Sequence, residues 1–195
     1  AIREAPVMPE TVSGVLEEAE HRMKRTVAAV ERDMAGVRTG RASPALLDTI
    51  KVEYYGSQLP ISQVATVSVP EPRLMVVAPW DVSAVPAIER AILTSDLGLT
   101  PQSDGRVIRL HIPPLTEERR KELVRLVGRM AEDGRVAIRN IRRDANESLD
   151  KLEKAGDISE DDRDAAKKRI QEMTDKYIKA VDEVLERKTE EIMEQ

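Results

Sequence analysis

The sequence predicts an α+β fold in which a long three-helix bundle carries a small inserted β/α/β domain. Apolar residues recur every three or four positions towards both ends of the 195-residue chain, which is the spacing of long helices. Residues 49–111 are instead rich in β-branched and turn residues. The chain has one Trp, three Tyr and no Phe. Its core must therefore be aliphatic, which suits long helices packed along their length.

The first helix is expected over residues 10–37. Its apolar residues follow a three-four spacing along a narrow seam. They are Val12, Leu16, Ala19, Met23, Val27, Val30, Met34 and Val37. We expect this helix to stop at Thr39-Gly40, because glycine readily adopts the left-handed conformation that closes helices.

Strands are expected within residues 49–111. Apolar and polar side chains alternate over residues 50–55, and β-branched residues dominate 64–69 and 74–77. A last strand is expected over residues 106–112. Turn residues separate the strands at Gly56-Ser57, Pro70-Glu71-Pro72 and Asp104-Gly105.

One short helix is expected among these strands. Ser83 is its expected cap, Pro86 falls in its first turn, where the missing N–H costs nothing, and Gly98 is its expected stop. Its apolar stripe consists of Ile88, Ile92 and Leu93. This helix supplies the α element of the inserted domain.

The second long helix is expected to begin after Pro113-Pro114, with Thr116 as its cap, and to reach Lys154 without a proline. At 1.5 Å per residue, its roughly 38 residues span about 57 Å, which is too long for a compact globule. A third helix should begin after Ser159 and continue to the end of the chain, because Ser159 and Asp162 have the spacing of a capping box.

Three long helices with apolar seams should pack as one bundle, so the strand-rich segment is an insertion between the first two helices. The predicted domains are residues 1–40 with 114–195 and residues 41–113, joined by hinge segments at 39–44 and 112–115. Because the inserted domain is tethered at two neighbouring points, it should bend as a unit, which predicts an L-shaped two-domain molecule. The hinge residues are Arg38, Thr39, Gly40, Arg41, Pro113 and Pro114.

The second long helix carries an arginine-rich face. Residues 115–143 contain nine basic and five acidic residues. With 100° between successive residues, seven of the basic residues fall within a sector of about 140°, opposite the apolar residues. This arginine face consists of Lys121, Arg125, Arg129, Arg135, Arg139, Arg142 and Arg143. Arg keeps its charge and offers a planar fork of donors that fits phosphate oxygens, so nucleic acid is the first candidate ligand.

The face alone leaves two interpretations open, because a solvated helix surface also tolerates arginine without any ligand. Glu132 and Asp133 interrupt the face, and we expect them to weaken Arg129 more than Arg139 or Arg142. The low aromatic content disfavours base stacking, so a nucleic acid would be held through its backbone. The net charge of −5 predicts local, oriented binding.

Other kinds of chemistry are not expected. The chain has no cysteine, which excludes disulfides and thiolate catalysis. It has no G-x-x-x-x-G-K-[ST] loop, and neither His21 nor His111 has the i, i+4 partner of a helical metal site. No run of 18 apolar residues or signal-peptide core occurs. We expect a cytoplasmic protein that is no enzyme and has no catalytic residue, cofactor, metal or membrane partner.

Five stretches occur together in one order along the chain. They are residues 37–44 (VRTGRASP), 52–56 (VEYYG), 95–99 (SDLGL), 113–120 (PPLTEERR) and 139–146 (RNIRRDAN). Through them the chain resembles the ribosome recycling factor family, also called ribosome-releasing factor, over residues 17–193. Residues 1–14 extend beyond the usual start of that family, and their role is not assigned.

The resemblance implies a bundle hinged to a β/α/β domain, with an outline similar to transfer RNA. It implies a monomer that binds the 50S and 70S ribosome after termination and, with elongation factor G and GTP, splits it into subunits and releases mRNA and tRNA. It also implies that the second helix contacts large-subunit ribosomal RNA through Arg120, Arg139 and Arg142. The arginine face adds Arg129, Arg135 and Arg143 as candidates.

Two alternatives stay open. Arg38 and Arg41 either contact RNA or only fix the first linker. The protein as a whole could instead be a helical adaptor or chaperone-like scaffold, whose arginine face meets an acidic protein partner.

Overall fold

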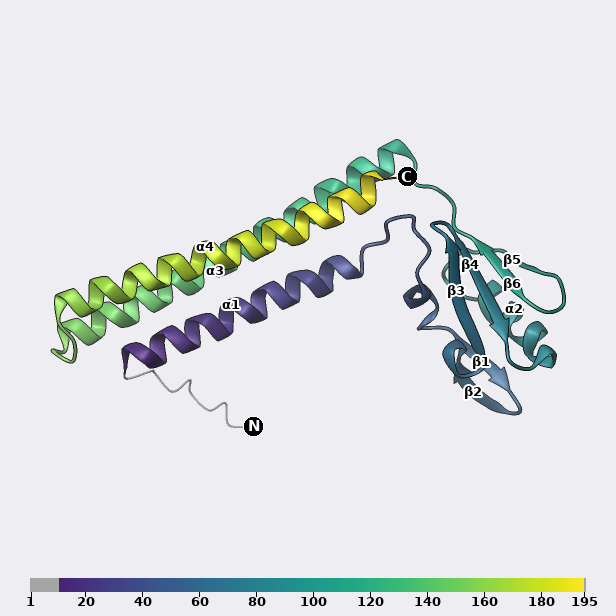
Figure 1. Ribbon diagram of the computed structural model, residues 1–195, viewed down its shortest axis with the longest axis horizontal. Helices are drawn as coiled ribbons and strands as arrows, with labels where there is room; N and C mark the ends of the chain where they lie inside the picture. The colour runs from purple at the N-terminus through teal and green to yellow at the C-terminus, as the bar shows by residue number, and fades with distance from the viewer. Residues whose placement is uncertain (1–10, 195) are drawn as a thin grey trace. The chain divides into compact units, whose positions relative to one another are not determined.

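The computed structural model describes residues 11–194 (Figure 1), so the expectations for residues 1–10 lie outside it. The predicted α+β fold, a long helical bundle with a small β-sheet domain inserted in it, is confirmed. The chain divides into two compact units. One holds the residues up to Val37 and those from Glu118 onward, and the other is Arg38–Glu117. The sequence placed these divisions after residues 40 and 113, so the structure assigns both linkers to the strand-containing unit.

Three helices form the first unit: α1 (Val12–Ala35), α3 (Glu117–Lys154) and α4 (Glu160–Met193). Each buries residues at three-four spacing, and these are almost all aliphatic or Met. In Figure 1 the three helices run side by side, so their buried seams form one elongated core. No helix within residues 11–194 has the length and apolar character needed to cross a membrane.

The helix ends agree in part with the prediction. Ser159 caps α4 as expected, because its side chain accepts a hydrogen bond from the N–H of Asp162 at 3.1 Å. The expected end of α1 at Thr39-Gly40 is wrong, since α1 ends at Ala35. Gly40 does have a positive φ of 74°, but it uses this conformation in the linker beyond the helix.

Polar contacts between helices accompany the apolar seams. The Tyr177 hydroxyl of α4 donates to Glu20 of α1 at 3.0 Å, and Arg22 of α1 pairs with Asp144 of α3 at 3.1 Å. Burial, followed by the contact with Glu20, raises the pKa of Tyr177 to about 12. These contacts link α1 to α4 and to α3 in addition to the apolar seams.

Gly134 of α3 packs closely against α1 and α4. A Cβ atom at this position would lie 2.6 Å from Cγ2 of Val30 in α1 and 3.8 Å from both γ-methyl carbons of Val181 in α4. A carbon–carbon distance of 2.6 Å is far below van der Waals contact. The absence of a side chain at Gly134 therefore sets how closely α3 packs against α1.

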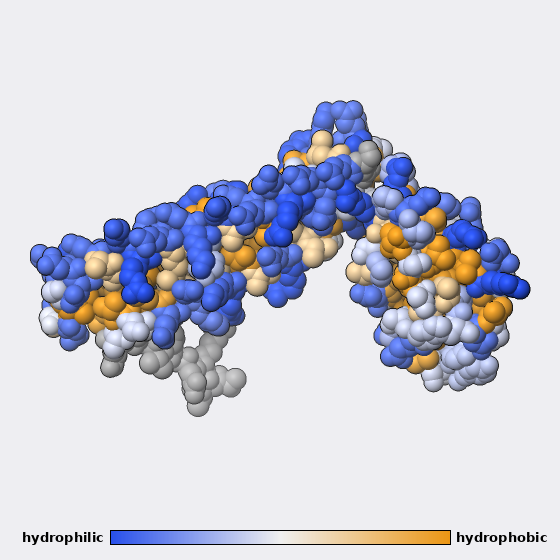
Figure 2. All heavy atoms as spheres, in the orientation of Figure 1, coloured by the Kyte–Doolittle hydropathy of each residue, from blue (hydrophilic) through white to orange (hydrophobic). Residues whose placement is uncertain are grey.

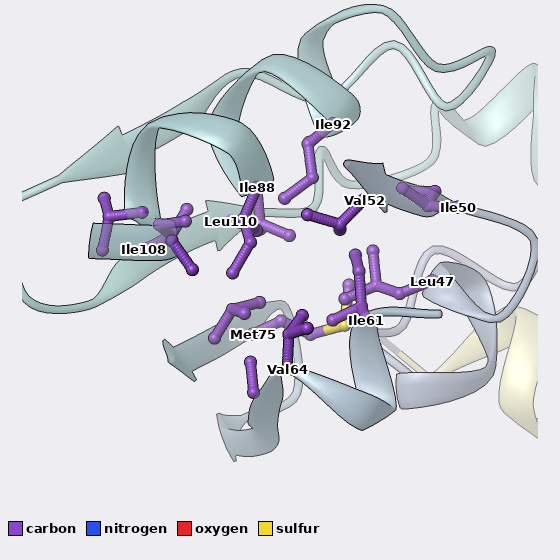
Figure 3. Packing of buried hydrophobic residues seen from close by; sticks show 14 residues of the cluster. Leu47, Ile50, Val52, Ile61, Val64, Met75, Ile88, Ile92, Ile108 and Leu110 are labelled. Carbon is purple, nitrogen blue, oxygen red and sulfur yellow. The ribbon is translucent and has the colours of Figure 1, made fainter. Parts of the chain in front are cut away.

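The second unit contains two antiparallel sheets. β1 (Lys51–Tyr54) pairs with β2 (Ser57–Pro60), while β3 (Ala65–Glu71), β4 (Leu74–Pro79), β6 (Ile108–His111) and β5 (Pro101–Ser103) form a four-stranded sheet in that order. α2 (Val85–Leu93) packs over the core. Figure 3 shows Ile88 and Ile92 of α2 directed toward Val52 and Leu110.

Several local predictions for this unit are wrong. β2 and β5 were not predicted, because both strands are short and lack a run of apolar or β-branched residues. The first turn comprises Tyr55 and Gly56 rather than Gly56-Ser57, and both turn residues have positive φ, as in a two-residue type I′ hairpin turn. The turn expected at Pro70-Glu71-Pro72 lies further along, because β3 continues to Glu71.

The short helix also differs in detail. Asp81, not Ser83, supplies the capping oxygen, and it accepts from the N–H of Ser83 in the 3₁₀ turn that precedes α2. Pro86 lies in the first turn of α2 as expected. Leu93 does not belong to the buried stripe, because it is 60% exposed.

The predicted turn at Asp104-Gly105 is confirmed as the link between β5 and β6. The N–H groups of Val107 and Arg106 donate to the Asp104 carboxylate at 3.0 and 2.9 Å. These two hydrogen bonds lower the pKa of Asp104 from its ordinary 3.8 to about 2. The ionised carboxylate thus stabilises this turn.

We predict that Gly134→Ala destabilises the protein by about 1–3 kcal/mol, because the new methyl group overlaps Val30. Gly128→Ala in the same helix is the matched control, since a Cβ at Gly128 meets nothing within 4 Å. That control should stabilise α3 by up to about 1 kcal/mol. Urea unfolding measures both values, and equal effects of the two substitutions would contradict the close approach.

We predict that Asp104→Asn reduces stability at neutral pH and reduces it much less at pH 2. The native pKa of Asp104 is lowered, so its contribution is fully present above the unfolded value, about 3.9, and is lost as the pH falls towards about 2. Unfolding of both proteins between pH 7 and pH 2 measures the difference. A difference that stays constant across this range would show that the charge of Asp104 is unimportant.

Candidate nucleic-acid interface

The arginine face lies on the side of α3 opposite its buried seam. The seam includes Leu123, Val127, Ala131, Gly134, Ile138 and Ile141. Because α3 is packed tightly at Gly134, the orientation of the opposite side is fixed as well. Figure 2 shows a mostly hydrophilic surface over the long helices. The six predicted RNA-binding arginines have different surroundings.

Arg135 and Arg142 lie on the edge of the face that adjoins α4. Arg135 donates through Nε to Asp182 at 2.7 Å and through Nη1 to Glu132 at 2.9 Å, and its side chain is only 20% exposed. Partial burial lowers the pKa of Arg135, but its bonds to Asp182 and Glu132 outweigh burial and raise the pKa above its ordinary value. Arg142 donates to the neutral side chain of Gln171 at 3.2 Å. Arg135 is thus the most firmly held of these arginines.

Arg139 lies at the centre of the face. It is exposed and donates through Nη1 to Oε1 of Glu132 at 3.3 Å. Glu132 thereby contacts both Arg135 and Arg139, and these arginines, Arg135 first, lower the pKa of Glu132. The sequence indicated that Glu132 would weaken Arg129 most, whereas the structure shows it engaged with the two arginines that follow it.

Arg129 and Arg143 lie on the outer edge of the face. Both are exposed, and neither forms a hydrogen bond or ion pair with any residue in the range 11–194. Their guanidinium groups are therefore fully available to an anion in solution. Arg139 joins them once its contact with Glu132 opens, which gives three exposed arginines on one rigid helix.

Arg120 does not belong to this face. It lies in the first turn of α3 and is half-buried, and its Nε atom is buried without a hydrogen-bond partner. A buried donor without a partner is costly, so Arg120 gains from any acceptor that reaches it.

The predicted hinge residues belong to the two linkers. Thr39 and Gly40 are buried, whereas Arg38, Pro113 and Pro114 are exposed. The linkers share one anchor: the N–H of Ala42 donates to the carbonyl of Pro72 at 2.7 Å, and the N–H of Ile112 donates to the carbonyl of Arg73 at 2.8 Å. Both linkers are thus bonded to the single turn that joins β3 and β4.

Sequence reasoning missed several of these contacts. Asp182 and Gln171 lie 47 and 29 residues from their arginine partners, so no local spacing points to them. The carbonyls of Pro72 and Arg73 have no side-chain signature at all. Among residues 11–194 no three His, Asp or Glu side chains form a group that could hold a metal ion.

Comparisons with known proteins agree on one family. The family model described as ribosome recycling factor matches residues 30–193. The ribosome-recycling factor of Symbiobacterium thermophilum is 56% identical over 180 residues, which are 92% of this chain and 97% of that protein. The ribosome-recycling factor of Bacillus subtilis is 52% identical over 180 residues, with the same two coverages of 92% and 97%.

Two solved structures are similar as well. The solution structure of a ribosome recycling factor is 48% identical, with a TM-score of 0.72 over 94% of this chain and 98% of that one. The second contains the T. thermophilus ribosome recycling factor and E. coli elongation factor G bound to the E. coli post-termination complex. Its matching chain is 50% identical, with a TM-score of 0.62 over 94% of this chain and 99% of that one.

We predict that Arg135→Ala lowers the free energy of unfolding by about 1 kcal/mol, because it removes two ion pairs, of which the one to Asp182 joins α3 to α4. Arg143→Ala is the matched control on the same helix, and it should change stability by less than about 0.5 kcal/mol. Chemical denaturation followed by circular dichroism measures both. Equal stability of the two variants would mean that the contacts of Arg135 do not contribute to the free energy of unfolding.

Proposed function

The chain belongs to the ribosome recycling factor family, and we propose from this that it binds the post-termination ribosome through the arginine face of α3. With elongation factor G and GTP, it then splits the ribosome into subunits, and mRNA and tRNA are released. A related factor occurs together with elongation factor G on a post-termination complex, which supports the choice of partners. A ribosomal partner also implies work in the cytoplasm.

One observation carries the RNA-binding part of this proposal. Arg129, Arg139 and Arg143 are exposed on a helix whose rotation is fixed by packing, so their charges keep a constant spacing. Because the helix backbone is already ordered, binding of phosphates by these guanidinium groups costs little backbone entropy. Because the protein as a whole carries a net charge of −5, attraction to RNA is confined to this face.

The protein performs no covalent chemistry in this proposal. It acts as a rigid anchor that carries a second unit, and the hinge segments 39–44 and 112–115 let that unit move when elongation factor G acts on it. Support comes from the linkers, which are both bonded to the turn at Pro72 and Arg73. A domain whose two ends are fixed to one turn moves as a single body.

We predict that Arg139→Ala with Arg142→Ala weakens binding to 50S subunits by at least about tenfold, because each charge-assisted hydrogen bond contributes roughly 1.5–3 kcal/mol. The salt dependence should also become flatter, by roughly one unit of slope for each phosphate that is no longer bound. The control is Arg25→Ala with Arg32→Ala, which removes two exposed positive charges from α1. Equilibrium binding at several salt concentrations measures both pairs.

The same variants then enter a subunit-splitting assay by light scattering, with and without elongation factor G and GTP. The unaltered protein should split 70S ribosomes only when both are present, and the variant with Arg139 and Arg142 replaced should split them more slowly than the control. No splitting by the unaltered protein would refute the proposed function. Equal binding to 50S subunits by the two double variants would show that the arginine face does not contribute to ribosome binding.

A further inference from the structure

Glu132 occupies an unusual place for a carboxylate, because it lies within the arginine face. Its side chain is 53% exposed, and each oxygen accepts from a different arginine: Oε2 from Arg135 at 2.9 Å and Oε1 from Arg139 at 3.3 Å. A phosphate group could accept from the same two guanidinium groups, because it also presents several acceptor oxygens. Glu132 thus occupies an anion position on a surface otherwise suited to anions.

The two contacts of Glu132 differ in how easily they open. Arg135 is also bonded to Asp182 at 2.7 Å and is only 20% exposed, so it stays in place and holds Glu132 there. Arg139 is 44% exposed, and within residues 11–194 its side chain bonds to Glu132 alone. Exchange of the carboxylate for another anion therefore frees Arg139 while the contact between Arg135 and Asp182 persists.

We propose that Glu132 is a specificity-determining residue of the arginine face, which competes with RNA phosphates for Arg139 and so limits the affinity of the face for RNA. This inference rests on the proposed function, in which the face binds ribosomal RNA. Glu132 is always adjacent to Arg139, so a phosphate displaces it only when other contacts hold that phosphate in place. Arg129 and Arg143, which are exposed and make no polar contact within residues 11–194, supply those other contacts.

The consequence is selection among polyanions. A single phosphate gains little at Arg139, because it replaces one ion pair by another of similar strength. An RNA surface that offers several phosphates at the spacing of Arg129, Arg139 and Arg143 binds all three guanidinium groups at once. Binding then depends on the arrangement of the phosphates as well as on their charge.

Asp133 provides a matched control for this idea. It is the next residue, it is exposed, and it carries the same charge. It lies about 100° further around the helix and outside the arginine face, so the expectation that Asp133 interrupts the face is wrong. It has no hydrogen bond or ion pair within residues 11–194. Asp133→Asn thus removes one negative charge near the face without opening any contact to an arginine.

The test measures equilibrium binding of the full chain to 50S subunits over a range of salt concentrations. Glu132→Gln should bind roughly two- to tenfold more tightly than the unaltered protein at about 0.1 M salt, since the exposed ion pair between Glu132 and Arg139 no longer competes. Its salt dependence should be steeper by up to about one unit, because no displaced carboxylate is left to take up a cation when a phosphate binds Arg139. Asp133→Asn should change affinity by less than about twofold, as expected for a screened charge off the face.

A double-substitution cycle shows whether the effect passes through Arg139. If Glu132 acts on this arginine, Glu132→Gln should lose most of its gain when Arg139 is already Ala. A full gain in that background would overturn the proposal. So would weaker binding of Glu132→Gln, which would mean that Glu132 orients the arginines for RNA, or an equal gain from Asp133→Asn, which would indicate a general charge effect.

The failure of this inference is distinguishable from failure of the proposed function. If Arg139→Ala weakens 50S binding but Glu132→Gln does not strengthen it, binding through the arginine face is supported and competition by Glu132 is refuted. If Arg139→Ala leaves 50S binding unchanged, Arg139 does not contribute to binding, and the proposed role of Glu132 is refuted as well. Circular dichroism of each variant checks its fold, which should persist because Glu132 is exposed.

Discussion

Close packing of α3 against α1 at Gly134 constrains how the helices of the bundle are arranged. A methyl group there would come within 2.6 Å of Val30, so this close packing depends on glycine and keeps the buried side of α3 toward α1 and α4. The opposite side of α3 then has a fixed orientation too. A charged surface on such a helix binds without first having to become ordered, so more of the contact energy appears as affinity.

The fixed orientation of α3 divides its arginines into groups with different availability. Arg135 is held by carboxylates on α3 and α4, and Arg139 shares Glu132 with it. Arg129 and Arg143 are exposed and make no polar contact within residues 11–194. The arginines therefore form a graded surface, in which their availability to a ligand increases away from α4. Those beside α4 form ion pairs or hydrogen bonds within the bundle, and among residues 11–194 those on the outer edge do not. In the proposed function, this grading keeps the attraction for RNA local in a protein of negative net charge.

The inserted unit depends on a separate aliphatic core and on one turn. Its core collects residues from both sheets, α2 and the 3₁₀ turns, as Figure 3 shows. The turn between β3 and β4 bonds both linkers through the carbonyls of Pro72 and Arg73. Backbone hydrogen bonds of this kind make the start and the end of the unit neighbours. The sequence indicated two linkers, but it had no means of showing that they share an anchor.

Short-range sequence patterns were sufficient to predict the long helices, the insertion, the start of α4 at Ser159 and the arginine row on α3. Each of these follows from a three-four period, a capping residue, or a sector of one helix. The same patterns did not reveal β2 and β5, which are too short and polar, or the Asp81 cap. Which arginines are available could not be predicted either, because Asp182 and Gln171 reach them from α4 across 47 and 29 residues of chain. Such pairings depend on how the helices pack, and packing is a property of the whole bundle rather than of any one segment.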